Sequence, residues 1–467
     1  MPRPTLTSFS GLKSTNPMIT TIKKASDPVA AVRSEAQPLA ITDDYERIVS
    51  WIGDATVVLL GEATHGTHDF YEARIRITRM LIENQGFSAV AIEGDWPDSY
   101  RVNKYVTASN PTGDATEALA GFERFPTWMW RNRTIVDFIS WLRARNAMVD
   151  PLKQAGFYGL DLYGLRSSMQ AVVEYLERRD PVAAEAARNS YACFDQFGSE
   201  CDDYAWASVH PRNGKALCEE AVTRVLVDLR NNRSAFLRHD GSAAADEFFY
   251  AEQNALLAHN AERYYRTMFK GRIAAWNIRD QHMAETLNAL LAHLRNRGQI
   301  PKVVVWAHNS HLGDARATDM GEQGELNLGQ LIRQHHPGRS KLIGLLTHNG
   351  TVIAASDWGA PAERKIVRPA LAGSYEALFH RTGMERFFLP LDEGTAASEA
   401  LAKPRLERAI GVVYRPETER LSHYFQASLP RQFDAVIHFD NTNALEPLDR
   451  LQPVAYGDVP ETFPSGV

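Results

Sequence analysis

Val57-Val-Leu-Leu60 is a run of four apolar residues that stops at Gly61. Such an uninterrupted run is typical of a parallel strand whose two faces are both covered, because neither face needs polar residues for contact with water. The loop Glu62-Ala-Thr-His-Gly-Thr-His68 follows, and residues 68–83 then carry a helical pattern. This order of strand, polar loop and helix predicts one unit of an α/β fold.

The alternation of strand and helix continues along the chain. Further short apolar runs are predicted as strands at Ala89-Val-Ala-Ile92, Phe157-Tyr-Gly-Leu160, Val303-Val-Val-Trp306, Leu342-Ile-Gly-Leu-Leu346, Val352-Ile-Ala-Ala355, Ile410-Gly-Val-Val413 and Ala435-Val-Ile-His438. Strands that alternate with longer helices favour a layered α/β architecture. The sequence therefore predicts a mostly parallel central sheet flanked by helices.

The middle of the chain has a different pattern. Between residues 165 and 297 apolar residues recur at helical spacing, as at Val222, Val225 and Leu229. We expect a large helical insertion that forms a lid over the carboxyl ends of the strands, with the α/β core at residues 39–164 and 298–455. Residues 1–38 are rich in Ser, Thr, Pro, Lys and Arg and are predicted to be a flexible leader.

Composition narrows the class of protein. The chain has 467 residues, 44% of them hydrophobic, and a formal net charge of -6, which is ordinary for a globular protein and does not favour a nucleic-acid partner. No apolar run approaches the ~20 residues of a membrane helix, and the amino terminus lacks a signal-peptide core. We expect a cytoplasmic protein with no membrane contact. Its three cysteines, Cys193, Cys201 and Cys218, are an odd number, so we expect no disulfide framework but buried or incidental thiols in a reducing compartment.

Ionisable side chains follow four of the predicted strands at the point where each strand ends. They are Glu62 and His65 after the first strand, Glu93 after the second, Asp161 after the third, and His308 and His311 after the fourth. In an open α/β sheet, ligands bind beyond the carboxyl ends of the strands. We therefore expect these side chains to share one site.

Histidine beside a carboxylate suits general base catalysis, since an imidazole with a pKa of about 6.5 is neutral at working pH and can still accept a proton. Glu62, His65 and His68 follow each other at intervals of three, so they share one face if the loop opens a helix. A carboxylate can also fix the imidazole tautomer. Arg74 lies further along the predicted helix, where we expect it to pair with Glu93 or another anionic group, unless it is an exposed surface cation.

Several catalytic motifs are absent from the sequence. There is no G-x-S-x-G elbow, no Walker A loop, no G-x-G-x-x-G and no H-E-x-x-H. The cysteines also lie away from every predicted strand end. These absences favour a water molecule activated by histidine over a protein nucleophile. A hydrolytic metal site is the alternative, because the same histidines and carboxylates are good ligands and their spacing does not separate the two possibilities.

An aromatic segment is the candidate for substrate binding. Phe125-Pro-Thr-Trp-Met-Trp130 is followed by Arg131, and its rings are suited to line a large apolar pocket, although plain core packing is the alternative. We predict that the substrate-binding residues are Trp128, Trp130, Arg131, Asp161 and Asn309.

Together these residues resemble the signatures of the erythromycin esterase family. Leu59-Leu-Gly-Glu-Ala-Thr-His-Gly66 looks like the first signature of that family, and Trp306-Ala-His-Asn-Ser-His311 looks like its second histidine signature. Arg74 and Glu93 stand at the spacing of the family. Also similar are Tyr158-Gly-Leu-Asp161, Arg279-Asp280 with Met283, and Phe433-Asp-Ala-Val-Ile437. The resemblance extends over residues 40–448.

The resemblance implies an α/β core with a helical lid and a metal-independent hydrolase that opens the macrolactone ring of 14-membered macrolides, as in antibiotic resistance. It implies that His65 is the general base that activates water and that Glu62 orients it. It also implies that His308, His311 and Arg74 position the water and stabilise the developing oxyanion. Glu93 would hold Arg74 or a histidine in place.

Our hypothesis from the sequence is a hydrolase that cleaves a carboxylic ester of a small molecule, such as a macrolide lactone or a similar cyclic ester, without a cofactor or a metal. Two alternatives stay open. One is a metal- or haem-handling protein on a related scaffold. The other is a role in exopolysaccharide biosynthesis of the succinoglycan type, a label that some members of the resembled family carry.

Overall fold

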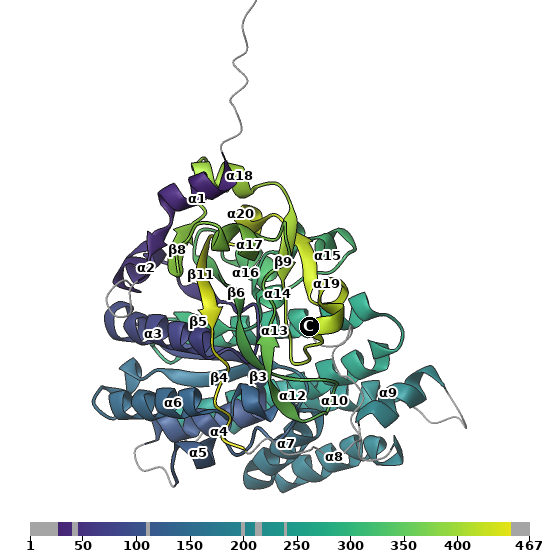
Figure 1. The fold of residues 1–467 in the computed structure, drawn as a ribbon. Coiled ribbons are helices and arrows are strands. Elements are labelled where there is room, and N and C mark those ends of the chain that lie inside the picture. The colour runs from purple at the N-terminus through teal and green to yellow at the C-terminus, as the bar shows by residue number, and fades with distance from the viewer. Residues whose placement is uncertain are drawn as a thin grey trace, which may run out of the picture.

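The computed structural model describes residues 27–39, 45–108, 113–197, 201–210, 217–237 and 241–449. Its central sheet has the strand order β1-β8-β11-β6-β2-β5-β3-β4, and β7 pairs with β6 outside this path (Figure 1). A separate two-stranded sheet joins β9 and β10. The strands are β1 (Gln37–Pro38), β2 (Val57–Leu60), β3 (Ala89–Asp95), β4 (Gly156–Asp161), β5 (Val303–Trp306), β6 (Ser340–Ala355), β7 (Ala362–Val367), β8 (Arg386–Pro390), β9 (Arg405–Arg408), β10 (Tyr424–Ala427) and β11 (Ala435–Thr442).

The centre of the sheet is parallel. β11, β6, β2, β5, β3 and β4 all run in the same direction. At the margins, β8 pairs antiparallel with β11, β1 pairs antiparallel with β8, and β7 pairs antiparallel with β6. Every residue of β2, β3, β4 and β5 is buried, which explains why these strands are apolar on both faces. The predicted α/β fold with a mostly parallel sheet is confirmed.

Some strands differ from the prediction. The two runs at residues 342–346 and 352–355 belong to one long strand, β6. The strand predicted at Ile410–Val413 was wrong, since this segment makes only isolated bridges, one from Ile410 to Thr64 and one from Val413 to Ala355. β7 was not predicted because most of its residues are at least partly exposed, so it has no continuous apolar run.

Helices flank this sheet. In the α/β core they are α1 (Pro28–Glu35), α2 (Tyr45–Ile52), α3 (His68–Gln85), α4 (Trp96–Thr107), α5 (Ala115–Ala118), α6 (Arg133–Asn146), α14 (Asn309–Leu312), α15 (Asp319–Glu322), α16 (Leu328–His335), α17 (Tyr375–His380), α18 (Ala396–Leu401), α19 (Glu419–Ser422) and α20 (Leu429–Gln432). The helix predicted from residue 68 is α3. It ends at Gly86, whose φ of 71° is a left-handed conformation that glycine adopts without steric cost.

Part of the predicted leader is integrated in the fold. The side chain of Asp27 caps α1 by accepting a hydrogen bond from the backbone N–H of Val29, at 3.2 Å. β1 then pairs antiparallel with β8, and α1 lies beside α18 (Figure 1). Residues 1–26 lie outside the described residues.

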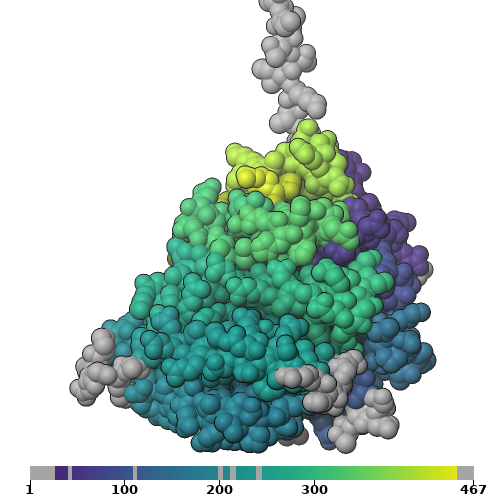
Figure 2. Space-filling model, turned by 180° about the vertical axis from the view of Figure 1, so that it is seen from behind, coloured from purple at the N-terminus to yellow at the C-terminus, as the bar shows by residue number. Residues whose placement is uncertain are grey.

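Between residues 165 and 297, the residues that the structure describes form helices and no strand. These are α7 (Leu165–Arg179), α8 (Pro181–Tyr191), α9 (Cys201–Val209), α10 (Glu219–Asn231), α11 (Arg233–Phe236), α12 (Gly241–Met268) and α13 (Arg272–Asn296). Their teal surface spreads over the lower part of the rear view (Figure 2). α12 packs on α7 and α13, and α13 reaches the sheet at β4. The function of a lid over the strand ends stays a prediction.

The absence of a disulfide was predicted and was wrong. Cys193 and Cys218 form a disulfide that links the segment after α8 to the start of α10. An odd number of cysteines argues against a framework in which every cysteine is paired, but it does not exclude one pair that the packing of two helices brings together. Cys218 is fully buried at this contact.

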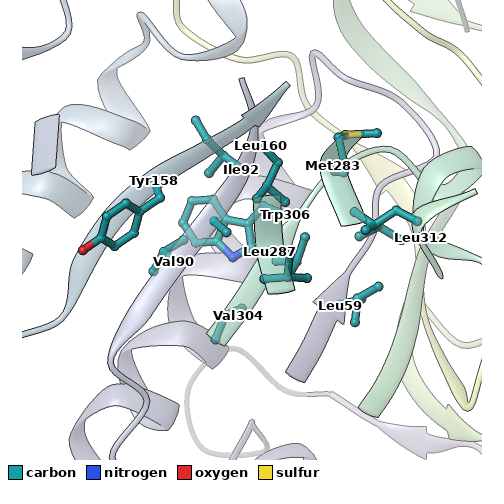
Figure 3. Packing of buried hydrophobic residues seen from close by; sticks show 14 of the residues in the cluster. Leu59, Val90, Ile92, Tyr158, Leu160, Met283, Leu287, Val304, Trp306 and Leu312 are labelled. Atoms are coloured by element: carbon teal, nitrogen blue, oxygen red, sulfur yellow. The ribbon is translucent and has the colours of Figure 1, made fainter. Parts of the chain in front are cut away.

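The core joins the insertion to the sheet. Met283 and Leu287 of α13 pack with buried residues of β2, β3, β4 and β5, which Figure 3 shows from close by. Trp306 of β5 is fully buried and donates a hydrogen bond to Thr78 Oγ1 of α3, at 3.0 Å. These contacts fix α3, which carries Arg74, and α13, which carries Arg279 and Asp280, against the central strands. No helix in the described ranges is long and apolar enough to cross a membrane.

Candidate active site

The loop after β2 is held by backbone hydrogen bonds on both sides. The N–H groups of Gly61 and Ala63 donate to carbonyl oxygens of β6, and the N–H of His65 donates to the carbonyl of Ile410, at 3.2 Å. The carbonyl of Gly66 accepts from Ile353 and Leu445. A Cβ at Gly66 would lie 1.9 Å from the carbonyl oxygen of Ile353, so only glycine permits this close approach. The loop therefore presents its side chains from a rigid backbone.

Within this loop, Glu62 and His65 form a hydrogen-bonded pair. His65 Nδ1 lies 3.0 Å from Glu62 Oε1, and the other carboxylate oxygen accepts from Arg74 Nη2 at 2.8 Å. All three side chains are buried, and Arg74 packs over the ring of Tyr71 at 4.3 Å. When the imidazole is neutral and Nδ1–H donates its hydrogen bond to Glu62, the Nε2 atom of His65 carries the lone pair. Nε2 has no hydrogen-bond partner among the described residues.

Arg74 therefore pairs with Glu62. The sequence analysis expected a pairing with Glu93 or with another anionic group, or else an exposed surface cation. Arg74 is fully buried, so it is not an exposed surface cation, and it does not line the cavity in front of His65. Its guanidinium instead supports the carboxylate that orients His65. The buried carboxylate of Glu62 and the buried guanidinium of Arg74 thus form an ion pair behind His65.

Glu93, at the end of β3, is the centre of a second charge network. Its Oε1 accepts from Arg279 Nη2 at 2.8 Å, and its Oε2 accepts from the backbone N–H of His308 at 2.8 Å. Arg279 also makes a bidentate pair with Asp161, at 3.0 and 2.7 Å. Burial alone would raise the pKa of Glu93, but His311, His65 and Arg279 outweigh it and hold this pKa well below its ordinary value. Glu93 is therefore ionised across the physiological range.

His311 is held as a cation by a carboxylate of α13. Its Nδ1 lies 2.9 Å from Asp280 Oδ2, and its ring stacks on Trp276 with the centroids 4.4 Å apart. Its Nε2 lies 3.4 Å from Glu93 Oε1 and 3.1 Å from Arg279 Nη1. Burial and Arg279 oppose the charge, but Asp280 and Glu93 outweigh them and raise the pKa of His311 to about 9.

This pKa predicts how stability depends on pH. Because the folded state raises the pKa of His311 above about 6.5, its contribution is complete below pH 6.5 and is lost as the pH rises through about 9. We expect the free energy of unfolding to fall by about 1 to 3 kcal/mol between pH 7 and 9.5, measured by urea unfolding. Asp280→Asn should flatten this slope. An equal slope in both proteins would contradict the assignment of the titration to this pair.

His308 is neutral and lies behind the site. Its Nδ1 accepts from the backbone N–H of Ser310 at 3.2 Å, so the proton of the neutral ring is on Nε2. Burial first, and then the neighbouring His65 and His311, lower the pKa of His308 well below its ordinary value. The rings of His308 and His65 are 4.9 Å apart. His308 thus packs against the back of His65.

A cavity of about 690 Å³, counting its open mouth, lies in front of these groups. Of the residues predicted for catalysis, His65 and Glu93 line it, while Glu62, Arg74, His308 and His311 are buried behind them. Of the residues predicted for substrate binding, Trp130 and Asp161 line it. The indole N–H of Trp130 also donates to the backbone carbonyl of Glu93, at 3.2 Å.

The remaining predicted binding residues do not line the cavity. Trp128 is buried in the core. Arg131 forms a bidentate pair with Asp449, at 2.8 and 2.7 Å. Asn309 is buried and donates to the carbonyl of Leu345 at 3.1 Å, next to Gly61. Asn309 and Arg131 thus support loops around the site.

His68 does not share the site of His65. Its Nδ1 lies 3.0 Å from Thr134 Oγ1, and it lines a different cavity together with Arg76 and Arg133. In the part of the chain that the structure describes, no group of three or more His, Cys, Asp or Glu side chains is placed to hold a metal ion. The metal-binding alternative therefore gains no support from this arrangement.

Sequence reasoning did not place Arg279 and Asp280 among the site residues. They come from α13, inside the helical insertion, and Arg279 is 118 positions from Asp161 and 186 positions from Glu93. No local spacing indicates such contacts. The only indication in the sequence was that Arg279-Asp280 matches a pattern of the resembled family, and that pattern did not assign a role to either residue.

Comparison with known proteins points to one family. The family model described as erythromycin esterase matches residues 82–442. A putative hydrolase of Bacillus subtilis is 22% identical, over 88% of this chain and 90% of that protein. Erythromycin esterase type II of Escherichia coli is also 22% identical, over 67% of this chain and 74% of that protein.

Solved structures share the fold. The crystal structure of a succinoglycan biosynthesis protein has a TM-score of 0.72 and 20% identity, and covers 91% of this chain and 98% of that one. A mutant erythromycin esterase in its open conformation has a TM-score of 0.65 and 16% identity, over 89% of this chain and 99% of that one. At these identities the structural likeness concerns the fold alone.

Proposed function

Because this chain belongs to the erythromycin esterase family, we propose that it hydrolyses a carboxylic ester with a water molecule that His65 activates. The family suggests a hydrolase that acts on an ester bond of a small molecule. Macrolide lactones are the first substrates to test, since two of the relatives are named erythromycin esterases.

The observation that carries this proposal is the position of His65. Among the residues that the structure describes, His65 is the only histidine that lines the cavity. Its Nδ1 is held by Glu62, and its Nε2 has no partner in the described part of the chain. An imidazole held in this way can take a proton from water and later return it. Glu62 then stabilises the imidazolium, and Arg74 holds the Glu62 carboxylate in place.

The cavity lining favours water as the nucleophile. Among the described residues that line the cavity there is no serine, threonine, cysteine or lysine. In the proposed reaction, the water proton moves to Nε2 of His65 while the water oxygen bonds to the carbonyl carbon. The bond to the alkoxy oxygen then breaks, and His65 returns the proton to that oxygen, which yields an acid and an alcohol. We assign Arg279, whose Nη1 contacts Nε2 of His311 but no carboxylate, to stabilise the developing negative charge.

A single-turnover experiment in H₂¹⁸O tests the proposal. Excess enzyme would be mixed with macrolide lactones and with aryl esters of short acids, and the products would be analysed by mass spectrometry. Direct attack of water places ¹⁸O in the product carboxylate in the first turnover. Unlabelled product in that turnover would mean that a protein carboxylate attacks first, and no product from any ester would contradict the esterase assignment.

A further inference from the structure

A second cavity lies between α3, α6, β7 and the segment that follows β11. Its volume is about 1340 Å³, counting its open mouth, and no described residue lines both this cavity and the one beside His65. The helices α3 and α6 that form two of its walls lie beside each other (Figure 1). We call it the arginine cavity, because four arginines line it, namely Arg76, Arg79, Arg133 and Arg364.

Two of the four arginines have no partner. Arg76 pairs with a glutamate of its own helix at 2.6 Å, and the guanidinium of Arg79 lies 4.6 Å from the ring centre of a tryptophan of α6. The side chains of Arg133 and Arg364 make neither a hydrogen bond nor an ion pair with any residue that the structure describes. A concave site with unpaired charges of one sign concentrates ligands of the opposite sign.

The position of Arg133 has no explanation in the stability of the fold. Arg133 is the first residue of α6, and the first turn of this helix has no acidic side chain. A cation is unfavourable at the amino terminus of a helix, where the helix dipole is positive, and an anion is favourable there. Arg364 alone would be ordinary, because charged residues are common on edge strands. A bound anion would compensate the guanidinium of Arg133 and the helix end together.

The walls of the arginine cavity are already fixed to one another. The backbone N–H of His68 donates to the carbonyl of Asn443 at 2.7 Å, and that of Arg133 donates to the carbonyl of Glu446 at 3.0 Å. A side-chain contact of 3.0 Å between His68 Nδ1 and Thr134 Oγ1 joins the starts of α3 and α6. A ligand would therefore find a preorganised site, which lowers the entropy cost of binding.

The charge of the lining defines which anion fits. Two exposed carboxylates, Asp137 and Glu446, also line the arginine cavity and reduce its positive potential. A ligand must therefore carry several negative charges and reach both unpaired arginines at once. The planar fork of a guanidinium matches two oxygens of a phosphate group. A diphosphate group offers enough charge and enough oxygen atoms for both Arg133 and Arg364.

We propose that the arginine cavity binds a diphosphate group between Arg133 and Arg364, as the free anion or as part of a small organic ester. Both arginines belong to segments that also form the cavity beside His65. Trp130 lines that cavity three residues before Arg133, and Trp358 lines it from the hairpin of β6 and β7 that carries Arg364. A diphosphate that joins the two arginines therefore restrains two walls of the other cavity.

Calorimetric titration of sodium diphosphate in a buffer without magnesium tests the binding site. We expect Arg133→Gln and Arg364→Gln each to weaken binding by about five- to twentyfold, because each removes a charge-assisted contact. Asp137→Asn should tighten binding by about two- to fivefold. The control Arg420→Gln removes an exposed arginine that lines neither cavity, and it should stay within about twofold of the wild type.

Hydrogen exchange read by mass spectrometry tests the restraint. Saturating diphosphate should slow exchange in residues 125–133 and 358–364 of the wild-type protein and leave it unchanged in Arg133→Gln at the same concentration. Arg133→Gln should keep the urea midpoint of the wild type, since it removes a cation from the unfavourable end of a helix. Neither measurement uses an ester, so each result stands whether or not the chain hydrolyses one.

The outcomes decide the proposal. No binding of diphosphate by the folded wild-type protein at millimolar concentration, or equal affinities in the three arginine variants, would overturn the site. Slower exchange only outside the two segments would overturn the restraint. ADP serves as a second probe. Equal affinity for ADP and diphosphate would support the free anion as the ligand, and tighter binding of ADP would support an organic diphosphate.

Discussion

His65→Ala is expected to lower kcat/KM for ester hydrolysis by about 10² to 10⁴, which is the usual contribution of a general base. The variant loses the imidazole that faces the cavity but keeps the Glu62–Arg74 pair, whose two charges still compensate each other. The fold should therefore be retained. Hydrolysis rates on the same ester, together with circular dichroism and urea unfolding of both proteins, would measure the effect.

His68→Ala is the matched control, since His68 belongs to the same loop but lines a different cavity. We expect this variant to keep wild-type kcat/KM within a factor of about three, because His68 contacts no group around His65. A folded His65→Ala protein with the activity of the control would remove His65 from the mechanism.

Arg279→Met has the largest expected effect on stability, a loss of about 3 to 5 kcal/mol in the free energy of unfolding. Arg279 is buried and neutralises two buried carboxylates, Glu93 and Asp161. Removing its charge leaves both carboxylates without this partner, and the pKa of Glu93, which Arg279 helps to hold down, should rise. Urea unfolding at pH 7 measures the loss, and unfolding at pH 5 should show a smaller one.

Two further variants make this result interpretable. Arg230→Met removes an arginine of the same insertion whose side chain is 48% exposed and pairs with Glu252, and it should cost less than about 1 kcal/mol. Arg279→Lys keeps the charge but cannot reproduce the bidentate contact with Asp161, so an intermediate stability is expected. Equal effects of Arg279→Met and Arg230→Met would show that the buried network contributes no more than a surface ion pair.

Much of the sheet could be predicted because its central strands are buried on both faces. β2, β3, β4 and β5 have no exposed residue, so each is a short apolar run that stands out from the sequence around it. β7 and the segment Ile410–Val413 show the limit of this signal. β7 pairs on one side and is largely exposed, and Ile410–Val413 is apolar and buried without belonging to a strand.

Contacts between helices could not be predicted from such local patterns. The bond between Cys193 and Cys218 joins two helical segments 25 residues apart, and only their packing brings the two sulfurs together. The same holds for Arg131, which sequence reasoning assigned to substrate binding. Arg131 forms an ion pair with Asp449, which lies more than 300 residues later in the chain, so no local spacing indicates this contact.

The sequence by itself determined the parts of this protein that depend on near neighbours. The apolar runs specify parallel strands, and the three-residue interval between Glu62 and His65 is short enough for one tight loop to hold both as a pair. The tertiary structure alone decided which histidine faces the cavity, that Arg74 supports Glu62, and that α13 supplies Arg279 and Asp280. These outcomes depend on how helices pack over the strand ends, since buried charges take whichever partner the packing brings within hydrogen-bonding distance.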